Sequence, residues 1–406
     1  MVTEEIADQS DMETFQFTGH RGPFCKLLLI NLFLTVITLG IYRFWAKTNV
    51  RRFIWSNIRF MGDPLEYTGK ASELLLGFLI VIAILFPLGL VYNLIQFLVP
   101  PDYFYLHVGL EVLYYLVLFA LIQVGFYRAW RYRMSRTTWR GIRLGLDGST
   151  WTFLKISVGW TVLTILTLGI AFPWMAVELW RYQITHTRVG TTVTSFNGMG
   201  RDMLPSWLIV MAPMWAIIIG FGSYFLFFFD AAALDVAAAN GDQQSTKVVL
   251  VNLFAPWVFL LTGFAYLITL IAWFWFNLDL ARYQISGMSL GEATIISRLP
   301  FGRLLAFAAL AICVFAVPAG IFGMLFTFEP GTGGKEFIVI LIAAMFATFI
   351  LLPIAWTLIF TFELVKQLFI TATITNPAAL GKVMQSAAET QKTGEGLADA
   401  LDIGGL

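Results

Sequence analysis

Eight long apolar runs dominate this sequence and restrict it to the membrane proteins. The runs cover residues 24–45, 71–99, 104–130, 151–180, 203–229, 247–280, 300–328 and 337–364. About 20 apolar residues in a helix are enough to cross a bilayer core of about 30 Å. Only 13% of the 406 residues are charged, against about 25% in an average soluble protein. Soluble multidomain folds are therefore excluded.

The positions of Lys and Arg indicate how many runs cross, because cytoplasmic loops of membrane proteins are enriched in both. If all eight runs crossed, the 26 basic residues would divide almost evenly between the two sides. If the first and fourth runs instead enter and leave on the same side, all of them except Lys247 and Lys335 share one side. The outward loops would then be residues 100–103, 230–246 and 329–336.

These counts predict an all-α polytopic membrane protein of six transmembrane helices and two re-entrant or interfacial broken helices. Both termini are expected in the cytoplasm. A seven-crossing version, in which the first run spans, also satisfies the charge distribution and stays open.

The first and fourth runs share a pattern at an offset of 129 residues. Thr38-Leu39-Gly40-Ile41 corresponds to Thr167-Leu168-Gly169-Ile170. Glycine weakens a helix by roughly 1 kcal/mol relative to alanine, and Pro173 favours a kink or stop in the second copy. The pattern predicts a duplicated unit whose apolar helix breaks and turns back before crossing.

Short stretches between the runs end in an aromatic-x-Gly sequence, as at Phe17-Thr18-Gly19, Tyr67-Thr68-Gly69 and Phe196-Asn197-Gly198. Such residues favour strands and turns, which predicts small cytoplasmic β elements. The expected organisation is a cytoplasmic segment (1–23), a first repeat unit (24–150), a second repeat unit (151–299), a third helical hairpin (300–370) and a cytoplasmic tail (371–406).

An arginine recurs at the predicted cytoplasmic end of four runs: Arg52, Arg131, Arg181 and Arg282. Three of them share a helix face with a tryptophan seven positions earlier and a polar residue three positions earlier. These orienting partners are Trp45, Trp174, Trp275, Asn49, Glu178 and Asp279. One interpretation is interfacial anchoring, with arginine reaching to phosphate. The other is a basic ring that binds an anionic solute or lipid headgroup at the cytoplasmic mouth.

Ionisable residues within the runs are few. His107 and Glu111 lie four apart, hence on one helix face, near the predicted outer end of the third run. They form a candidate outer-mouth pair, either solvated or involved in proton or cation handling. Glu363 and Lys366 close the last run, where an intrahelical ion pair accounts for them.

Several motifs combine unusual residues in a fixed order. They are Phe15-Gln16-Phe17-Thr18-Gly19, Asn31-Leu32, Thr38-Leu39-Gly40-Ile41-Tyr42, Trp45-Ala46-Lys47, Arg51-Arg52-Phe53, Trp139-Arg140-Gly141-Ile142-Arg143 and Gly396-Leu397-Ala398-Asp399-Ala400-Leu401-Asp402. In these motifs the chain resembles the YjgN-like family of bacterial inner-membrane proteins. The resemblance implies a location in the bacterial cytoplasmic (inner) membrane. The family is a domain of unknown function, so the resemblance implies no catalytic or binding residues.

The sequence has no His-Glu-x-x-His pair, Cys-x-x-Cys pair or phosphate-binding glycine loop. We therefore expect no enzyme, no metal site, no cofactor and no nucleic-acid partner. Broken helices favour a transporter or channel-like permease for a small, anionic solute that the sequence does not name. The alternative is a non-transporting membrane protein that organises lipid or a protein assembly through its basic cytoplasmic face. The lipid bilayer, including its anionic headgroups, is the expected partner.

Overall fold

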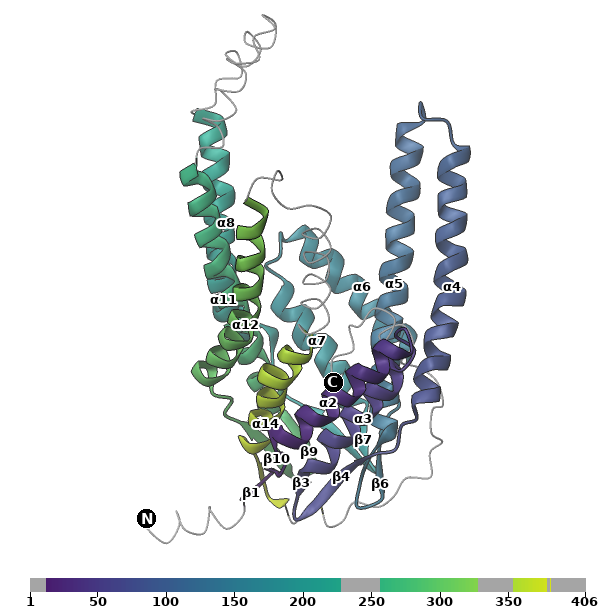
Figure 1. Cartoon of the computed structure of the whole chain (residues 1–406), viewed down its shortest axis with the longest axis vertical. Coiled ribbons are helices and arrows are strands. Elements are labelled where there is room, and N and C mark those ends of the chain that lie inside the picture. The colour runs from purple at the N-terminus through teal and green to yellow at the C-terminus, as the bar shows by residue number, and fades with distance from the viewer. Residues whose placement is uncertain (1–11, 228–255, 328–352, 378–379, 381–406) are drawn as a thin grey trace, which may run out of the picture.

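An eleven-stranded antiparallel sheet forms the base of the molecule (Figure 1). The computed structural model describes residues 12–227, 256–327, 353–377 and 380. The strands are β1 (Met12–Thr14), β2 (Gln16–Phe17), β3 (Ile58–Phe60), β4 (Asp63–Tyr67), β5 (Thr137–Trp139), β6 (Ile142–Leu146), β7 (Thr187–Val189), β8 (Thr192–Phe196), β9 (Met288–Leu290), β10 (Ala293–Ser297) and β11 (Ala372–Thr375). From β2 to β11 each strand pairs with the next along the chain.

The N-terminal segment nearly closes this sheet into a barrel. β1 pairs with β11 and β2 pairs with β3, while Phe15 alone separates β1 from β2. The two ends of the sheet are therefore joined by one short stretch of chain. Among the described strands, only the outer edges of the short β1 and β2 are left without a partner strand.

Two-residue turns connect the strands of four hairpins at one rim of the barrel, which we call the turn rim. In Met61-Gly62 and Arg140-Gly141 both residues have positive φ, as a type I′ turn requires. In the other two hairpins the first turn residue, Gly190 or Gly291, has positive φ, as in a type II′ turn. Both turn types match the twist of paired strands, which explains why the hairpins are so short.

Helical segments connect the strands at the opposite rim, the helix rim. They are α2 (Arg21–Ile37), α3 (Arg43–Asn57), α4 (Ala71–Leu98), α5 (Phe104–Arg136), α6 (Thr150–Leu166), α7 (Phe172–Thr185), the 3₁₀ helix η1 (Gly200–Met203), α8 (Leu204–Phe227), α11 (Pro256–Ser286), α12 (Phe301–Thr327), the π-helical η2 (Thr357–Thr361) and α14 (Phe362–Ile370). Each segment leaves and returns at paired residues: Phe17 with Ile58, Tyr67 with Thr137, Leu146 with Thr187, Phe196 with Met288, and Ser297 with Ala372. The five described helical segments therefore leave the barrel and rejoin it at the same rim.

The expectation of an all-α fold with six spans is wrong. The strands form one barrel rather than small separate elements. The described residues contain five helices long and apolar enough to cross a membrane: Ala71–Leu98, Phe104–Arg136, Gly200–Gly220, Leu260–Ser286 and Pro353–Ile370. Of the predicted outward loops, 230–246 and 329–336 lie outside the described residues.

The first and fourth apolar runs each fold into a helical hairpin, which we call the first elbow (residues 21–57) and the second elbow (residues 150–185). Leu39 and Gly40 have φ of 50° and 91°, and Leu168 and Gly169 have nearly the same values, 52° and 92°. Left-handed backbone of this kind ends a helix, and glycine adopts it without strain. The helices on either side of each break pack against one another.

The tips of both elbows stay close to the barrel. Phe44 of the first elbow packs on Ala71, Leu74 and Phe78, at the start of α4. Trp207, at the start of α8, donates a hydrogen bond of 2.9 Å from its indole N–H to the carbonyl of Gly169 in the second elbow. Phe78 and Trp207 each lie seven residues into their spans, which is about 10 Å at 1.5 Å per residue.

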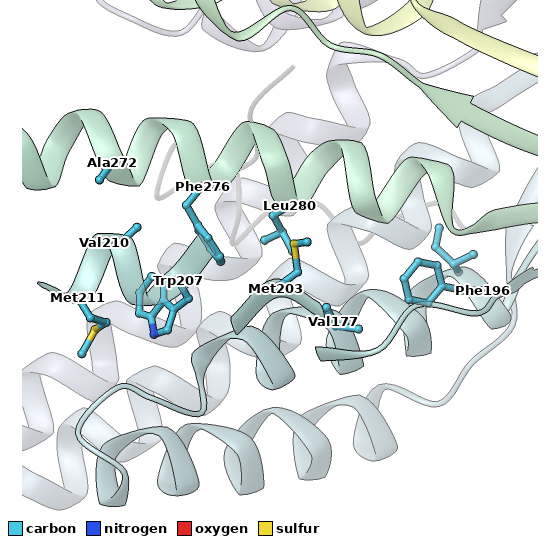
Figure 2. Close-up of a cluster of buried hydrophobic side chains, with 10 residues drawn as sticks. Val177, Phe196, Met203, Trp207, Val210, Met211, Ala272, Phe276 and Leu280 are labelled. Atoms are coloured by element: carbon cyan, nitrogen blue, oxygen red, sulfur yellow. The ribbon is translucent and has the colours of Figure 1, made fainter. Parts of the chain in front are cut away.

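Apolar side chains fill the barrel interior. One cluster joins Phe60 of β3 and Trp139 of β5 to Ala293 of β10 and Ile374 of β11, strands from opposite sides of the barrel. A second cluster, on the helix side, holds the second elbow against α8 and α11 (Figure 2). The barrel is thus a packed core from which each helical segment leaves.

Candidate functional site

The four arginines singled out in the sequence make one and the same contact at the helix rim. Each donates an Nη–H to the carbonyl oxygen of the residue 17 positions later, just beyond the following hairpin. The pairs are Arg52 with Gly69, Arg131 with Gly148, Arg181 with Gly198, and Arg282 with Leu299. We call these contacts the rim bonds; each ties the end of one helix to the start of the next.

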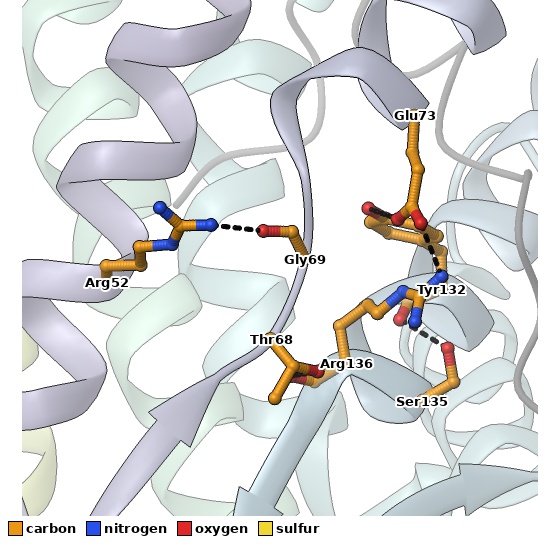
Figure 3. A network of polar contacts seen from close by, with 7 residues as sticks. All are labelled: Arg52, Thr68, Gly69, Glu73, Tyr132, Ser135 and Arg136. Atoms are coloured by element: carbon orange, nitrogen blue, oxygen red, sulfur yellow. Dashed lines mark hydrogen bonds and ion pairs between the residues drawn. The ribbon is translucent and has the colours of Figure 1, made fainter.

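The glycines of the aromatic-x-Gly sequences are required by close packing at the rim bonds. A Cβ added at Gly69 would lie 2.5 Å from the ring of Tyr67, and one at Gly198 would meet Phe196 and Tyr283. Ordinary carbon contacts are about 3.5–4.0 Å. The aromatic ring two residues earlier therefore covers each of these two glycines. Figure 3 shows the Arg52 guanidinium at the carbonyl of Gly69.

The three polar residues predicted to orient the arginines have different partners, and only one of them contacts its arginine. Glu178 forms an ion pair of 2.5 Å with Arg181, three residues away on α7. Asp279 instead accepts a hydrogen bond of 2.6 Å from Ser206 of α8. Asn49 donates to Asn31 and Tyr42, both within the first elbow.

The three tryptophans seven positions before the arginines are only partly covered. Trp45 is exposed and stacks on Tyr42, while Trp174 and Trp275 are half-buried. All three are compatible with an interfacial position.

Two of the four guanidinium groups keep an N–H group for other contacts. The Nε–H groups of Arg131 and Arg282 are buried and lack an acceptor among the described residues. Use of these arginines to bind an anion stays a prediction, whereas their rim bonds give them a structural role.

The predicted outer pair is not brought into contact among the described residues. The ring nitrogens of His107 lie within hydrogen-bond reach of Gln96 Oε1 and, at 3.2 Å, of the Pro100 carbonyl. Glu111 is exposed on α5. His107 thus helps to close the turn between α4 and α5, and a role for the pair in proton or cation handling stays a prediction.

The partner predicted from sequence for the buried carboxylate of Glu363 is wrong. Glu363 is 2% exposed and forms ion pairs with Arg21 (2.9 Å) and Arg303 (3.1 Å), rather than with Lys366. Gln367 adds a hydrogen bond of 2.7 Å. This charge cluster joins α2, α12 and α14 next to the point where the N-terminal segment closes the barrel. The spacing of Glu363 and Lys366 on one helix does not predict this cluster, because both arginines lie on other helices.

A second polar cluster joins α4 to α5 at the helix rim (Figure 3). Glu73 forms an ion pair of 2.8 Å with Arg136 and accepts a hydrogen bond of 2.7 Å from Tyr132. Arg51, which is 0% exposed, donates to the Tyr67 hydroxyl at 3.1 Å. Buried charges in contact with partners of this kind hold neighbouring elements in one arrangement.

These features define a polytopic membrane protein whose apolar helices all begin and end on one side of a packed strand barrel. The chain belongs to the family described as "Bacterial protein of unknown function (DUF898)", which it matches over residues 12–400. The expected membership of the YjgN-like family is thereby confirmed.

One curated relative supports the membrane location. The chain is 30% identical over 136 residues to "Inner membrane protein YjgN" of Salmonella typhimurium strain LT2. The aligned stretch covers 34% of this chain and 32% of that relative, about a third of its length. No solved structure matches the chain.

Proposed function

We propose that this protein is a non-transporting membrane protein that organises the lipid of one leaflet, with its barrel and both termini in the cytoplasm. The observation that carries this proposal is the pair of elbows. One barrel holds both tips on the same side and about 10 Å along neighbouring spans. Both elbows also direct apolar side chains outward, such as Phe33 and Leu39 in the first and Leu166 and Leu168 in the second.

The depth that each elbow reaches fits one leaflet, although its helices are longer than one leaflet is thick. α2 has 17 residues and α6 has 17, which is about 25 Å for each at 1.5 Å per residue. Contacts with the first turns of α4 and α8 hold the tips near the barrel. An apolar helix at this depth displaces lipid on one side of the membrane only, as amphipathic interfacial helices do.

The distribution of basic residues supports a cytoplasmic barrel. Arg59, Arg140, Arg143 and Arg188 lie on its strands or turns, whereas the turn between α4 and α5 at residues 99–103 has no basic residue. Short cytoplasmic loops of membrane proteins carry the excess of Lys and Arg.

Transport of a small anionic solute is the competing function, and two observations weigh against it. An apolar cluster packs between strands on opposite sides of the barrel, where a solute path along the barrel axis would have to run. Each of the four arginines proposed for a basic mouth also donates to a carbonyl of its own chain.

Reconstitution of the purified protein into liposomes separates the two functions. We expect no protein-dependent uptake of any anionic solute screened, and we expect lipid to be retained through purification. Uptake that is lost in Arg181→Ala or Arg282→Ala, with wild-type folding by circular dichroism, would replace lipid organisation by transport.

A further inference from the structure

We propose that the barrel opens at one built-in place, the seam where the first elbow meets α14, and that Arg21 is the latch that holds this seam closed. An open seam would regulate the lipid-organising function proposed above. Exchange of backbone amides detects such opening whether or not the protein organises lipid.

Five units of one design make up the described barrel. Each unit is a strand (β1 and β2 together in the first unit), a helical segment and a returning strand, and the units cover residues 12–60, 63–139, 142–189, 192–290 and 293–375. In every unit the N–H of the residue after the first strand donates to the carbonyl of the residue before the returning strand. These five bonds, of 2.8 to 3.2 Å, join Thr18 with Asn57, Thr68 with Arg136, Asp147 with His186, Asn197 with Gly287, and Arg298 with Thr371. The junctions between the units are therefore directly comparable.

Four of the five junctions are closed in two ways. A two-residue turn joins the returning strand of one unit to the first strand of the next, at residues 61–62, 140–141, 190–191 and 291–292. A rim bond, from an arginine six residues before the returning strand, spans the same junction. The second elbow lies in the third unit, so both of its junctions are of this kind.

The fifth junction, which we call the seam, has neither a turn nor a rim bond among the described residues. It is formed by β1 and β11, whose direct partners Met12 and Thr375 lie far apart along the chain. The position of a rim arginine, six residues before β11, is held by Lys366. Lys366 makes no hydrogen bond or ion pair within the part of the chain that the structure describes. The first elbow, which lies in the first unit, therefore borders the most weakly closed junction of the barrel.

Arg21 of α2 crosses the seam with three contacts. It donates a hydrogen bond of 2.9 Å to Glu363 of α14. Its guanidinium also lies over the rings of Phe307 and Phe362, at 4.7 and 5.9 Å from their centres. All three partners belong to the fifth unit, so Arg21 holds the first unit to the fifth.

The ion pair of Arg21 can break without leaving a buried charge alone. Glu363 has a second partner, Arg303 of α12, at 3.1 Å, and both of these residues lie in the fifth unit. The carboxylate therefore keeps one arginine when Arg21 leaves. The Arg21 side chain is itself 46% exposed. Departure of Arg21 thus avoids the strongly destabilising case, in which one member of a buried ion pair is left unpaired.

Opening of the seam would uncover apolar surface on the first elbow. Phe24 of α2 is fully buried, and its ring lies 5.2 Å from that of Phe362 across the seam. Leu28, one turn further along α2, belongs to the same cluster and is 7% exposed. An open seam would add these side chains to the lipid contact of the first elbow and leave the second elbow unchanged.

Arg21 and Arg303 form a matched pair for a test, because they share one carboxylate and only the Arg21 bond crosses the seam. Loss of Arg21 should raise the ratio of open to closed seams about two- to fivefold, which corresponds to about 0.4–1 kcal/mol, as for partly exposed ion pairs. Loss of Arg303 should not raise this ratio, because Glu363 then has Arg21 as its remaining arginine.

Hydrogen–deuterium exchange of the full-length protein in lipid nanodiscs, followed by mass spectrometry, tests the seam. Amides of β1 and β11 report on the seam, and amides of β7 and β8 report on a junction with a turn and a rim bond. We expect faster exchange at the seam in the wild type, a further two- to fivefold increase there in Arg21→Gln, and no increase in Arg303→Gln. Exchange at β7 and β8 should be the same in all three proteins, which shows that the variants are folded.

A locked seam gives a second reading that depends on neither arginine variant. A disulfide between Thr14→Cys and Thr373→Cys, in a background with Cys25→Ser and Cys313→Ser, should slow exchange at the seam to the level of β7 and β8. Fraying of β1 alone would not respond to Arg21→Gln, because Arg21 lies on α2, beyond β2. Equal exchange at the two junctions in the wild type, equal effects of the two arginine variants, or a seam that the disulfide does not slow would overturn the inference.

Failure of this inference can be told apart from failure of the proposed function. If liposomes take up solute while exchange shows the expected pattern, the non-transporting function is wrong and the seam stands. If exchange is the same at both junctions and no solute is taken up, the seam is wrong and lipid organisation stands.

Discussion

Replacement of Gly198 by Ala tests the close packing at a rim bond. The added Cβ would lie 2.7 Å from a ring carbon of Tyr283 and closer still to Phe196. Ordinary carbon contacts are about 3.5–4.0 Å, so both rings must move by roughly 1 Å. Phe196 is 5% exposed and belongs to the cluster that holds the second elbow against α8 and α11, so its ring has no open space to enter.

Overpacking of this kind lowers the free energy of unfolding by about 1–3 kcal/mol. The measurement is a titration of the purified protein in detergent with sodium dodecyl sulfate, followed by circular dichroism. Gly220→Ala in α8 is the control, because no atom lies within 4 Å of its added Cβ, and it should be neutral or stabilising by up to about 1 kcal/mol. A change below about 0.5 kcal/mol for Gly198→Ala, the range of ordinary surface substitutions, would refute the reasoning.

Glu363→Gln should lower the free energy of unfolding by about 1–3 kcal/mol in the same titration, because a buried partner of two arginines is lost. Asp147→Asn, at an ion pair whose acid is mostly exposed, should change it by less than about 1 kcal/mol. Arg282→Ala should lower it by about 1–3 kcal/mol through loss of its rim bond, with no effect on solute flux. Thr14→Cys combined with Thr373→Cys should form a disulfide within one chain, because these residues are direct partners in β1 and β11.

Each of these outcomes has a clear opposite. If Glu363→Gln and Asp147→Asn lowered the free energy of unfolding equally, burial of the Glu363 ion pairs would add nothing to stability. Solute uptake by the wild type that a stable Arg282→Ala variant loses would contradict a purely structural role of the rim bond. Absence of the disulfide under oxidising conditions, with Cys25 and Cys313 replaced, would mean that the N-terminal segment does not close the barrel.

The sequence predicted the breaks at Gly40 and Gly169 because helix termination is local. Both glycines have positive φ, a backbone conformation that few other residues adopt without strain. The arginines at the helix ends were also found from spacing alone. Their acceptors were not, since a carbonyl 17 residues ahead has no sequence signature.

The barrel could not be predicted, and the reason lies in its strands. They are two to five residues long, too short to show the alternating pattern that identifies a strand. Their pairing joins residues far apart in the chain, such as Tyr67 with Thr137 and Met12 with Thr375. Glu363 and Arg21 likewise lie 342 residues apart, so only the closed barrel brings them together.

The central claim is that one barrel on one side of the membrane anchors every helical segment. Single cysteines at Asp63, Arg143, Thr192 and Glu292, in or beside the four hairpin turns, and at Asp102, between α4 and α5, test it with a membrane-impermeant thiol reagent. The fold predicts that the four barrel cysteines all react from one side of the membrane and that the cysteine at 102 reacts from the other side. In the proposed orientation, the barrel cysteines react only in inverted membrane vesicles and the cysteine at 102 only in whole cells. Barrel cysteines that react from different sides, or a cysteine at 102 that reacts from the same side as the barrel, would contradict the central claim.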